Sequence, residues 1–274
     1  TGVIIAGMTT SISIPAATVI LARPRQDGVP EFLLVKRGEN LAFAGGALVF
    51  PGGRVDASDI TIARNADLAN GFEGLDDADA AARITCAREA LEETGVLLTE
   101  GPAPDPAALA YARKLLAEGP DSDEAIEFAG MLGGMGHKVA ASRFLPFARW
   151  EPPANAAIVR RFDTRFYLAD AGNAASAAIS PDGHEAMALQ WTTAADALAG
   201  YDAGSIAMVF PTWCNMHRLA QYQSLVSLFE GVARTGAPYV QPAFERLGEE
   251  TWLTIPEGID YPVTRDRVEN LRRE

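Results

Sequence analysis

Three glutamates that stand close together in the sequence could bind a metal ion. Glu89, Glu92 and Glu93 lie at relative positions 0, 3 and 4, which places them on one face of a helix with ~3.6 residues per turn. Carboxylates are hard oxygen ligands, the kind that Mg²⁺ and Mn²⁺ prefer. Arg88 stands beside them and can hold one carboxylate through its fork of N–H donors. A solvated acidic helix face is the alternative interpretation.

The residues around the glutamates predict the helix that carries them. Ile84, Ala87 and Leu91 recur at helical spacing on roughly the opposite face, which indicates an amphipathic helix over 79–94. Gly95 interrupts the pattern and suits a helix C-cap. Aspartates suit the start of a helix, so a structural role is favoured over metal binding for Asp76, Asp77 and Asp79.

A glycine pair upstream could bring the backbone close to the same site. Phe50 and Pro51 precede Gly52 and Gly53, and Asp56 and Asp59 follow shortly afterwards. Adjacent glycines adopt backbone conformations closed to other residues and allow close approach to a ligand or metal. The pattern therefore predicts a glycine turn beside the acidic helix.

Together these two segments resemble the signature of the Nudix hydrolases. That signature is Gly, five residues, Glu, seven residues, then Arg-Glu-apolar-x-Glu-Glu-x-Gly-apolar, and residues 88–96 match its second half at every fixed position. The first half matches at Gly53, with Asp59 where Glu is expected. Here 28 residues, 60–87, stand in place of seven. If the seven-residue spacing is counted back from Arg88, Ala80 stands where the first Glu of the signature is expected. The first carboxylate of the signature is therefore either Asp59 or absent.

With a long insertion at this place, the chain resembles the branch of the family that contains mammalian peroxisomal coenzyme A diphosphatases. The resemblance spans roughly residues 15–200 and includes four further segments, 33–37, 46–50, 83–85 and 160–166. The chain departs from the better-known coenzyme A signature at Ala42 and Gly38, where that signature has Arg and Ser.

The resemblance implies a fold and a reaction. The fold is an α/β Nudix sandwich of α/β/α layers around a mixed sheet, with added inserted and C-terminal helices. The cofactor is Mg²⁺ or Mn²⁺, held by Glu89, Glu92 and Glu93 with the Gly52 carbonyl as a further ligand, and Arg88 orients a glutamate. The general base is a glutamate of the motif or Glu185.

The substrate implied is a small nucleoside diphosphate derivative whose diphosphate linkage is hydrolysed. Coenzyme A or acyl-coenzyme A is the first choice, and ADP-ribose, a dinucleotide or a nucleotide sugar is the alternative. A Nudix domain that only binds a nucleotide, as a sensor, belongs to a different class of function. That alternative predicts the loss of the motif glutamates, and this chain retains all three.

Basic residues and one glycine are candidates for substrate binding. Arg37 follows a predicted strand, and the densest basic cluster before the C-terminal tail lies in another predicted strand region. Phosphate binding is one interpretation. A solvated strand end is the alternative for Arg37, and protection of a sheet edge is the alternative for the cluster. The full set is Arg37, Gly53, Arg160, Arg161 and Arg165.

Composition narrows the remaining possibilities. The net charge of −13 disfavours nucleic acid as a partner, because a phosphate backbone requires a basic face. No apolar run reaches the ~18–20 residues of a membrane helix, and no basic region precedes the apolar start, so a signal peptide is not expected. Two distant cysteines predict buried free thiols. We therefore expect a cytoplasmic protein without a membrane partner.

Alternating strand and helix patterns predict the domain organisation. A Nudix domain is expected over 14–200, with a box insertion at 60–80 and a helical insertion at 104–136. A helical extension at 201–274 is expected to pack on it, with one apolar helix over 213–233 and a charged helix over 265–274. The apolar helix would serve as core or as the seam of a homodimer. His137 is expected in a solvated loop.

Overall fold

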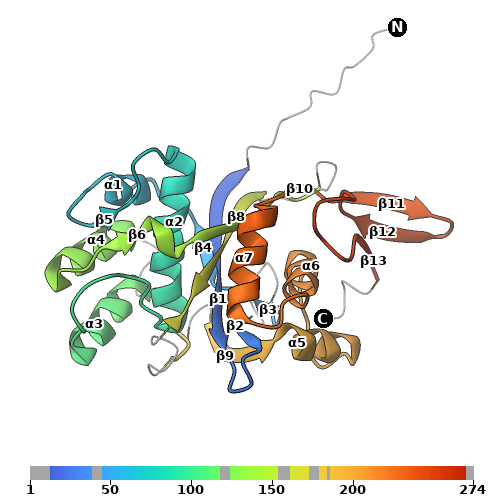
Figure 1. Cartoon of the computed structure of the whole chain (residues 1–274), viewed down its shortest axis with the longest axis horizontal. Helices are drawn as coiled ribbons and strands as arrows, with labels where there is room; N and C mark the ends of the chain where they lie inside the picture. Colours follow the sequence, from blue (N-terminus) through green and yellow to red (C-terminus); the bar gives the residue numbers. More distant parts are fainter. Residues whose placement is uncertain are drawn as a thin grey trace, which may run out of the picture.

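A mixed sheet forms the centre of the protein (Figure 1). The computed structural model describes residues 13–38, 45–117, 124–153, 161–172, 179–183 and 186–269. Within these ranges eight strands make one sheet in the order β10-β7-β8-β1-β2-β3, with β4 paired to β1 and β9 to β2. The β1–β8 and β7–β10 pairs are parallel, and the others are antiparallel. The strands are β1 (Ile14–Pro24), β2 (Pro30–Arg37), β3 (Leu48–Val49), β4 (Gly52–Arg54), β7 (Leu145–Trp150), β8 (Phe162–Asp170), β9 (Ala186–Thr193) and β10 (Tyr239–Val240).

The central strand β1 supplies both hydrophobic cores. Val19 and Leu21 point into one core and Ile20 and Ala22 into the other, and all four are fully buried. This alternation follows from the two-residue period of a strand, and a strand covered on both faces reads as a continuous apolar run. Apolar runs at 14–23 and 31–36, separated by a turn with prolines and a glycine, predict a hairpin, and the antiparallel pairing of β1 with β2 at Ala22 and Phe32 confirms it.

Helices cover both faces of the sheet, which confirms the α/β sandwich with its mixed sheet (Figure 1). One face carries α1 (Asp59–Ala63), α2 (Asp77–Glu89), α3 (Pro106–Ala117) and α4 (Glu124–Met135), which enclose what we call the α2-side core. The other carries α5 (Ala194–Asp202), α6 (Phe210–Leu219) and α7 (Leu225–Thr235) around the α7-side core. No helix in the described ranges has both the length and the apolar character needed to cross a membrane.

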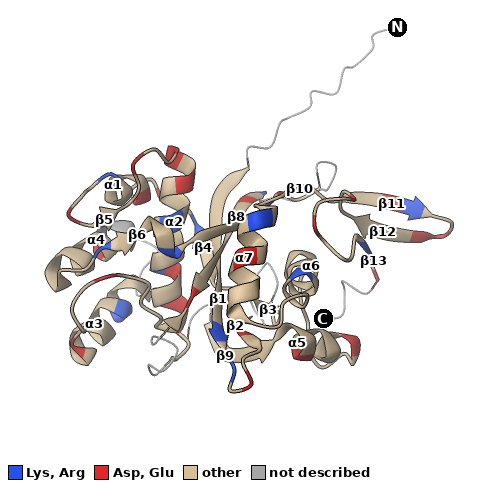
Figure 2. Cartoon of the chain, viewed as in Figure 1, with Lys and Arg blue, Asp and Glu red and all other residues tan. Residues whose placement is uncertain are grey.

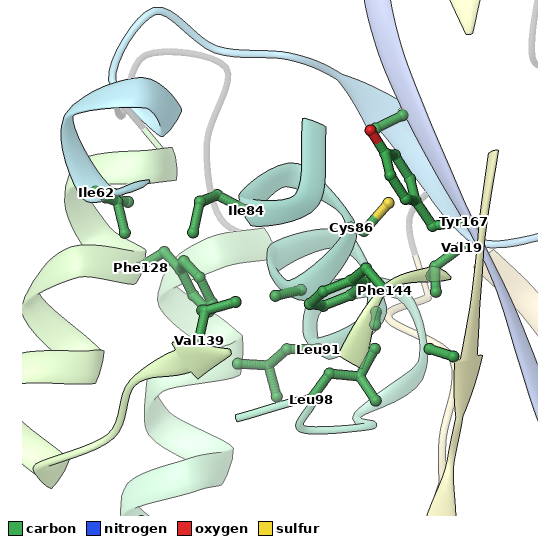
Figure 3. Packing of buried hydrophobic residues seen from close by; sticks show 14 of the residues in the cluster. Val19, Ile62, Ile84, Cys86, Leu91, Leu98, Phe128, Val139, Phe144 and Tyr167 are labelled. Carbon is green, nitrogen blue, oxygen red and sulfur yellow. The ribbon is translucent and has the colours of Figure 1, made fainter. Parts of the chain in front are cut away.

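Helix α2 is packed on several sides rather than on one. Figure 3 shows Ile84 turned toward Ile62 and Phe128, and Cys86 turned toward Tyr167 of β8. Every residue from 80 to 89 is buried. The expected amphipathic pattern is therefore wrong over residues 80–89, because α1 and α4 cover the side that does not face the sheet.

The box insertion and the helical insertion take part in the same core. The polar, acidic and alanine-rich composition of residues 60–78 predicts a surface excursion, but this insertion buries Ile62 and Phe72 in the α2-side core. Its short strand β5 (Ala69–Asn70) pairs with β6 (Val139–Ala140), which a 3₁₀ turn at Ala141–Arg143 follows. The glycines between 130 and 136 predict a flexible break, but α4 continues through most of them to Met135.

The C-terminal extension differs most from its prediction. The single helix expected over 213–233 is two helices, and α7 starts anew at the capping box formed by Ser224 and Ser227. Beyond α7, the strands β11 (Ala243–Leu247), β12 (Glu250–Thr254) and β13 (Arg265–Arg267) form a three-stranded antiparallel sheet. The charged helix expected from residue 265 is thus wrong over β13, and residues 270–274 lie outside the described residues.

Buried Arg218 of α6 ties this extension to the central sheet. Its Nη1 donates to the Phe147 carbonyl of β7 at 2.6 Å, and its Nη2 reaches Asp260 Oδ2 at 3.1 Å. The same Nη2 donates to Thr235 Oγ1 at 2.9 Å, at the end of α7. The guanidinium also lies 4.4 Å from the centre of the Phe147 ring. One side chain therefore connects α6, α7, β7 and the loop before β13.

We expect Arg218→Met to lower the free energy of unfolding by about 3 kcal/mol. The substitution leaves the buried Phe147 carbonyl without its donor and removes the positive charge that faces Asp260. Arg246→Met is the matched control, since Arg246 lies on exposed β11 and its loss should cost under about 0.5 kcal/mol. Urea unfolding measures both. Equal effects of the two substitutions would show that Arg218 does not tie the extension to the sheet.

Candidate functional site

The N-terminus of α2 is fixed by aspartates. The Asp76 side chain caps the helix by accepting the N–H of Asp79 at 2.7 Å. Asp79 in turn accepts from Arg83 Nε at 3.1 Å and from the Tyr167 hydroxyl at 2.5 Å. These two aspartates are thus occupied by contacts that hold α2 on β8, as the predicted structural role requires.

The last turn of the glutamate helix is a π-helix rather than a continuation of α2. It spans Ala90–Thr94 (η1) and ends at Gly95, whose φ of 77° confirms the predicted left-handed C-cap. The expected regular α-helix to Thr94 is therefore wrong in its last turn. A π-turn closes its hydrogen bonds over five residues instead of four and often occurs at functional sites. Here it widens the turn that carries Glu92 and Glu93.

The glutamates are held by specific donors. Glu89 and Glu93 expose only 8% and 3% of their surface, so the solvated-face interpretation is wrong for both. Glu89 Oε1 accepts from Arg88 Nη1 at 2.8 Å, and Glu93 Oε2 accepts the N–H of Gly52 at 3.0 Å. Glu92 Oε2 lies 3.9 Å from Arg88 Nη1. The structure thus brings together the predicted residues Gly52, Arg88 and the three glutamates.

Arg88 is a fully buried cation at the centre of this arrangement. Its Nη2 donates to the Arg54 carbonyl at 3.0 Å and lies 3.5 Å from both Asp56 Oδ2 and Asp59 Oδ2. A buried charge is tolerated when it is paired and hydrogen-bonded. Arg88 therefore joins α2 to β4 and to the start of α1, and basic and acidic residues lie together along α2 (Figure 2).

Asp59 reaches the site although 29 positions separate it from Arg88. Its Oδ2 accepts the N–H of Asp56 at 2.9 Å and the Thr85 hydroxyl at 2.7 Å, and its Oδ1 is buried with no hydrogen-bond partner among the described residues. Burial raises the pKa of its carboxyl, and the nearby Arg88 charge opposes that rise. Ala80, the other position considered for the first carboxylate of the signature, is buried in the core. The insertion therefore returns the chain so that Arg88 lies against Asp59.

The glycine pair permits close approach rather than a turn. Gly52 and Gly53 lie in strand β4, paired with Thr18 and Ala17 of β1, and neither has a positive φ, so the predicted glycine turn is wrong. A Cβ atom added to Gly53 would lie 2.2 Å from Glu89 Oε1, and one added to Gly52 would lie 2.4 Å from the Ala17 carbonyl oxygen. The absent side chains let β4 contact both the strand and the glutamate.

The structure separates the predicted basic residues. Arg165 is the β8 partner of Ala17, which pairs with Gly53 on its other side. It stands two residues before Tyr167, whose side chain enters the α2-side core, so strand alternation places Arg165 on the α2 face. By contrast, Arg161 donates to two backbone carbonyls, those of Pro152 and Pro153, at 2.7 and 2.8 Å. Its guanidinium is thereby engaged in local structure.

The remaining predicted residues lie at the end of a strand, in a loop or outside the described residues. Arg37 is half-buried at the end of β2, where the pairing with β9 shifts register. Arg160 and the possible base Glu185 lie outside the described residues. His137, expected in a solvated loop, is instead buried, with Nδ1 at 2.7 Å from Thr99 Oγ1 and Nε2 at 2.9 Å from the Pro102 carbonyl.

One residue near the glutamates was not singled out from the sequence. Arg113 of α3 donates from Nε to the backbone carbonyl of Glu92 at 2.9 Å. It belongs to the helical insertion, 21 residues along the chain from Glu92. Its sequence surroundings are those of an ordinary Ala- and Leu-rich helix, so no local motif could identify it.

The donor set fits a hard divalent cation. The motif supplies three carboxylates, and Gly53 lacks the Cβ that would collide with the carboxylate of Glu89. Oxygen ligands of this kind suit Mg²⁺ and Mn²⁺. In the conformation shown, no three His, Cys, Asp or Glu side chains of the described part converge as a preformed metal site. Two of the three glutamates instead hold Arg88 and the Gly52 N–H.

The two glycines are expected to respond differently to substitution by alanine. Gly53→Ala displaces the Glu89 carboxylate, so we expect weakened Mn²⁺ binding and a stability loss of about 1 kcal/mol or more, because Glu89 also pairs with buried Arg88. Gly52→Ala collides with the β1 backbone and should cost about 2 kcal/mol or more. Urea unfolding and Mn²⁺ titration followed by electron paramagnetic resonance measure these effects. Wild-type Mn²⁺ affinity in Gly53→Ala would contradict a metal-binding role for Glu89.

Comparison with known proteins places this geometry in context. No family model matches the chain. Acyl-coenzyme A diphosphatase NUDT19 from Homo sapiens is 27% identical, with 87% of this chain and 74% of that protein aligned. The protein of the same name from Xenopus laevis is 23% identical, with 86% and 72% aligned.

Solved structures show the same architecture. A NUDIX hydrolase from Alicyclobacillus acidocaldarius superposes with a TM-score of 0.62 at 24% identity, covering 80% of this chain and 96% of that one. The similarity in fold is independent of the signature residues on which the sequence comparison began. The chain therefore has the Nudix hydrolase fold, and its sequence resembles the acyl-coenzyme A diphosphatases.

Proposed function

We propose that this enzyme hydrolyses the diphosphate linkage of coenzyme A or of an acyl-coenzyme A in a metal-dependent reaction. The observation that carries the proposal is the glutamate cluster, in which Glu89 and Glu93 are buried and held by Arg88 and by the N–H of Gly52. The choice of substrate is supported by two relatives named acyl-coenzyme A diphosphatase that align with most of the chain.

The metal would be held by Glu89, Glu92 and Glu93, with the Gly52 carbonyl as a further ligand. A bound Mg²⁺ or Mn²⁺ offsets the negative charge of a diphosphate and makes water a better nucleophile. The protein's part is to keep these carboxylates near the proposed metal position, and Arg88 and the N–H of Gly52 hold Glu89 and Glu93 there. Metal binding would draw carboxylate oxygens away from these donors, because no three such side chains of the described part converge beforehand.

Hydrolysis of coenzyme A would yield 3′,5′-ADP and a phosphopantetheine. Water attacks one phosphorus, the bridging P–O bond breaks, and the departing phosphate takes the electron pair. A general base must accept a proton from the water, and a motif glutamate or Glu185 is proposed for this role. Arg165 and Arg37 are proposed to attract the phosphates, which a chain with a net charge of −13 needs locally.

The remaining interpretations of the sequence stay predictions. ADP-ribose, dinucleotides and nucleotide sugars share the diphosphate chemistry and would differ in the pocket around the other end of the substrate. A binding-only sensor is disfavoured because all three motif glutamates are present. We likewise predict a cytoplasmic location and no nucleic-acid or membrane partner. The domain boundary near residue 200 and a homodimer also stay predictions. The homodimer has lost its original basis, the single helix over 213–233.

Product analysis by mass spectrometry tests the proposed reaction. We expect purified protein with Mg²⁺ or Mn²⁺ to release 3′,5′-ADP from coenzyme A, and chelator to abolish the release. ADP-ribose, NADH and a diadenosine polyphosphate are offered in parallel. Hydrolysis of one of these in place of coenzyme A would refute the substrate while retaining the reaction. No hydrolysis of any of them by folded protein would count against the proposed function.

Glu93→Gln tests the carboxylate within the same assay. The substitution removes a negative oxygen at a buried position, and we expect kcat to fall by about 10² or more because groups that act directly on the reaction contribute on this scale. Glu100→Gln is the matched control, since Glu100 is exposed and bonds Asn70 at 3.0 Å. An unchanged kcat in Glu93→Gln would remove Glu93 from the proposed metal-binding set.

A further inference from the structure

The last carbonyl groups of the glutamate helix are bound by residues from outside it. A helix leaves its final carbonyls without partners of its own, and here Gly95 ends the helix directly after Glu92, Glu93 and Thr94. The Glu92 carbonyl accepts from Arg113 Nε at 2.9 Å, and the Thr94 carbonyl accepts the N–H of Ser180 at 3.3 Å. The turn that carries two of the proposed metal ligands is therefore held from its C-terminal side.

Arg113 connects the two outside elements to each other. Its Nη1 donates to the Ser180 hydroxyl at 2.6 Å, and its Nη2 donates to the Ser180 carbonyl. The guanidinium also lies against Gly95, where an added Cβ would meet Nη1 at 3.3 Å. We call the group formed by Arg113, Ser180 and the Glu92 carbonyl the Arg113 clasp. It joins α3, η1 and the segment before β9.

The clasp also fixes where β9 begins. Asp182 Oδ1 accepts the N–H of Ala186 at 3.1 Å, and the N–H of Gly183 donates to the Ala186 carbonyl at 3.0 Å. Ala186 is the first residue of β9 and pairs with Arg37 of β2. Because Ser180 is held by the clasp and this turn follows within two residues, the start of β9 is set relative to the glutamates.

The chemistry of arginine suits this position. The planar guanidinium presents donors in a fixed fork, so one side chain can reach two carbonyls and a hydroxyl at once, whereas a lysine ammonium is a single point of attachment. A positive charge near the C-terminal end of a helix is also favoured by the helix dipole. Asp182 and Glu92 add favourable charge interactions, although burial lowers the pKa of Arg113 overall.

We propose that Arg113 is a positioning residue of this hydrolase, which holds the turn of Glu92 and Glu93 against the segment 179–183 and thereby sets the geometry of the metal-binding glutamates. The inference rests on the proposed function, and it assigns the helical insertion a role in that function. Arg113 acts through the backbone and through Ser180, without itself touching the reacting atoms.

Three variants test the proposal in the whole 274-residue chain. Arg113→Met keeps side-chain length but removes all donors, and Arg113→Lys keeps the charge but loses the fork. Arg64→Met is the matched control, because Arg64 also donates to two backbone carbonyls, those of Phe72 and Leu75, and to Asp77. Arg64 lies in the box insertion, and none of these three partners belongs to the glutamate turn.

Hydrogen exchange gives a readout that does not depend on activity. Loss of the clasp should allow local opening, so we expect the Ser180 amide to exchange about tenfold faster in Arg113→Met. Exchange at Ser180 should stay at the wild-type rate in Arg64→Met. Wild-type exchange at Ser180 in Arg113→Met would overturn the proposal, since the clasp would then not hold the segment.

Kinetics separate positioning from general stability. We expect Arg113→Met to lower kcat about tenfold with KM changed less than about threefold, since small misplacements of catalytic groups reduce rate more than binding. Arg113→Lys should give an intermediate kcat, and Arg64→Met should stay within about twofold of wild type. Thermal unfolding is measured for all variants. A kcat in Arg113→Met equal to that of Arg64→Met would overturn the proposal.

A failure of the proposed function is distinguishable from a failure of this inference. If wild-type protein hydrolyses none of the offered diphosphates, the function fails and Mn²⁺ titration replaces kcat as the readout. Arg113→Met should then bind Mn²⁺ at least about fivefold more weakly, because misoriented ligands lose affinity on this scale. Equal Mn²⁺ affinity in Arg113→Met and Arg64→Met would overturn the positioning role.

Discussion

The charge of Arg88 is the constraint around which this site is built. A guanidinium with no exposed surface is costly unless acceptors surround it. Its acceptors come from three separate segments, namely the Arg54 carbonyl of β4, the carboxylates of Asp56 and Asp59 near α1, and Glu89 of α2. Loss of any of these contacts would leave the cation under-paired. The position of the proposed metal-binding glutamates is therefore coupled to the correct return of a long insertion.

The elements that the sequence predicted well are those with a single dominant pattern. The run of apolar residues in β1, the hairpin to β2 and the start of α2 at Asp76 each follow from local chemistry that tertiary packing reinforces. The spacing of the three glutamates with Arg88 likewise predicted a cluster, and the structure brings these residues together. The sequence did not decide whether Asp59 is the first carboxylate of the signature. Its position beside Arg88 depends on how the insertion folds, which no local pattern describes.

Other features depend on contacts between distant residues and could not be read locally. The π-turn at Ala90–Thr94 is compatible with the same residues as an α-helix. The division of α6 from α7 depends on the Ser224 capping box within a region of continuous apolar spacing. The glycines Gly52 and Gly53 were correctly taken to mark a close approach, but the partners of that approach are a neighbouring strand and Glu89. Arg113 had no sequence signal at all.

The parallel pairing of β1 with β8 has a consequence for how the chain is made. Residues 14–22 pair with residues 162–170, so the central strand lacks one neighbour until more than half of the polypeptide has left the ribosome. Such long-range contacts slow folding, because a large loop must close before they form. Strand β4 and its glycines can join β1 early, whereas the other side of β1 stays open as an exposed edge. An unpaired apolar edge promotes aggregation, so the nascent chain is most vulnerable during this interval.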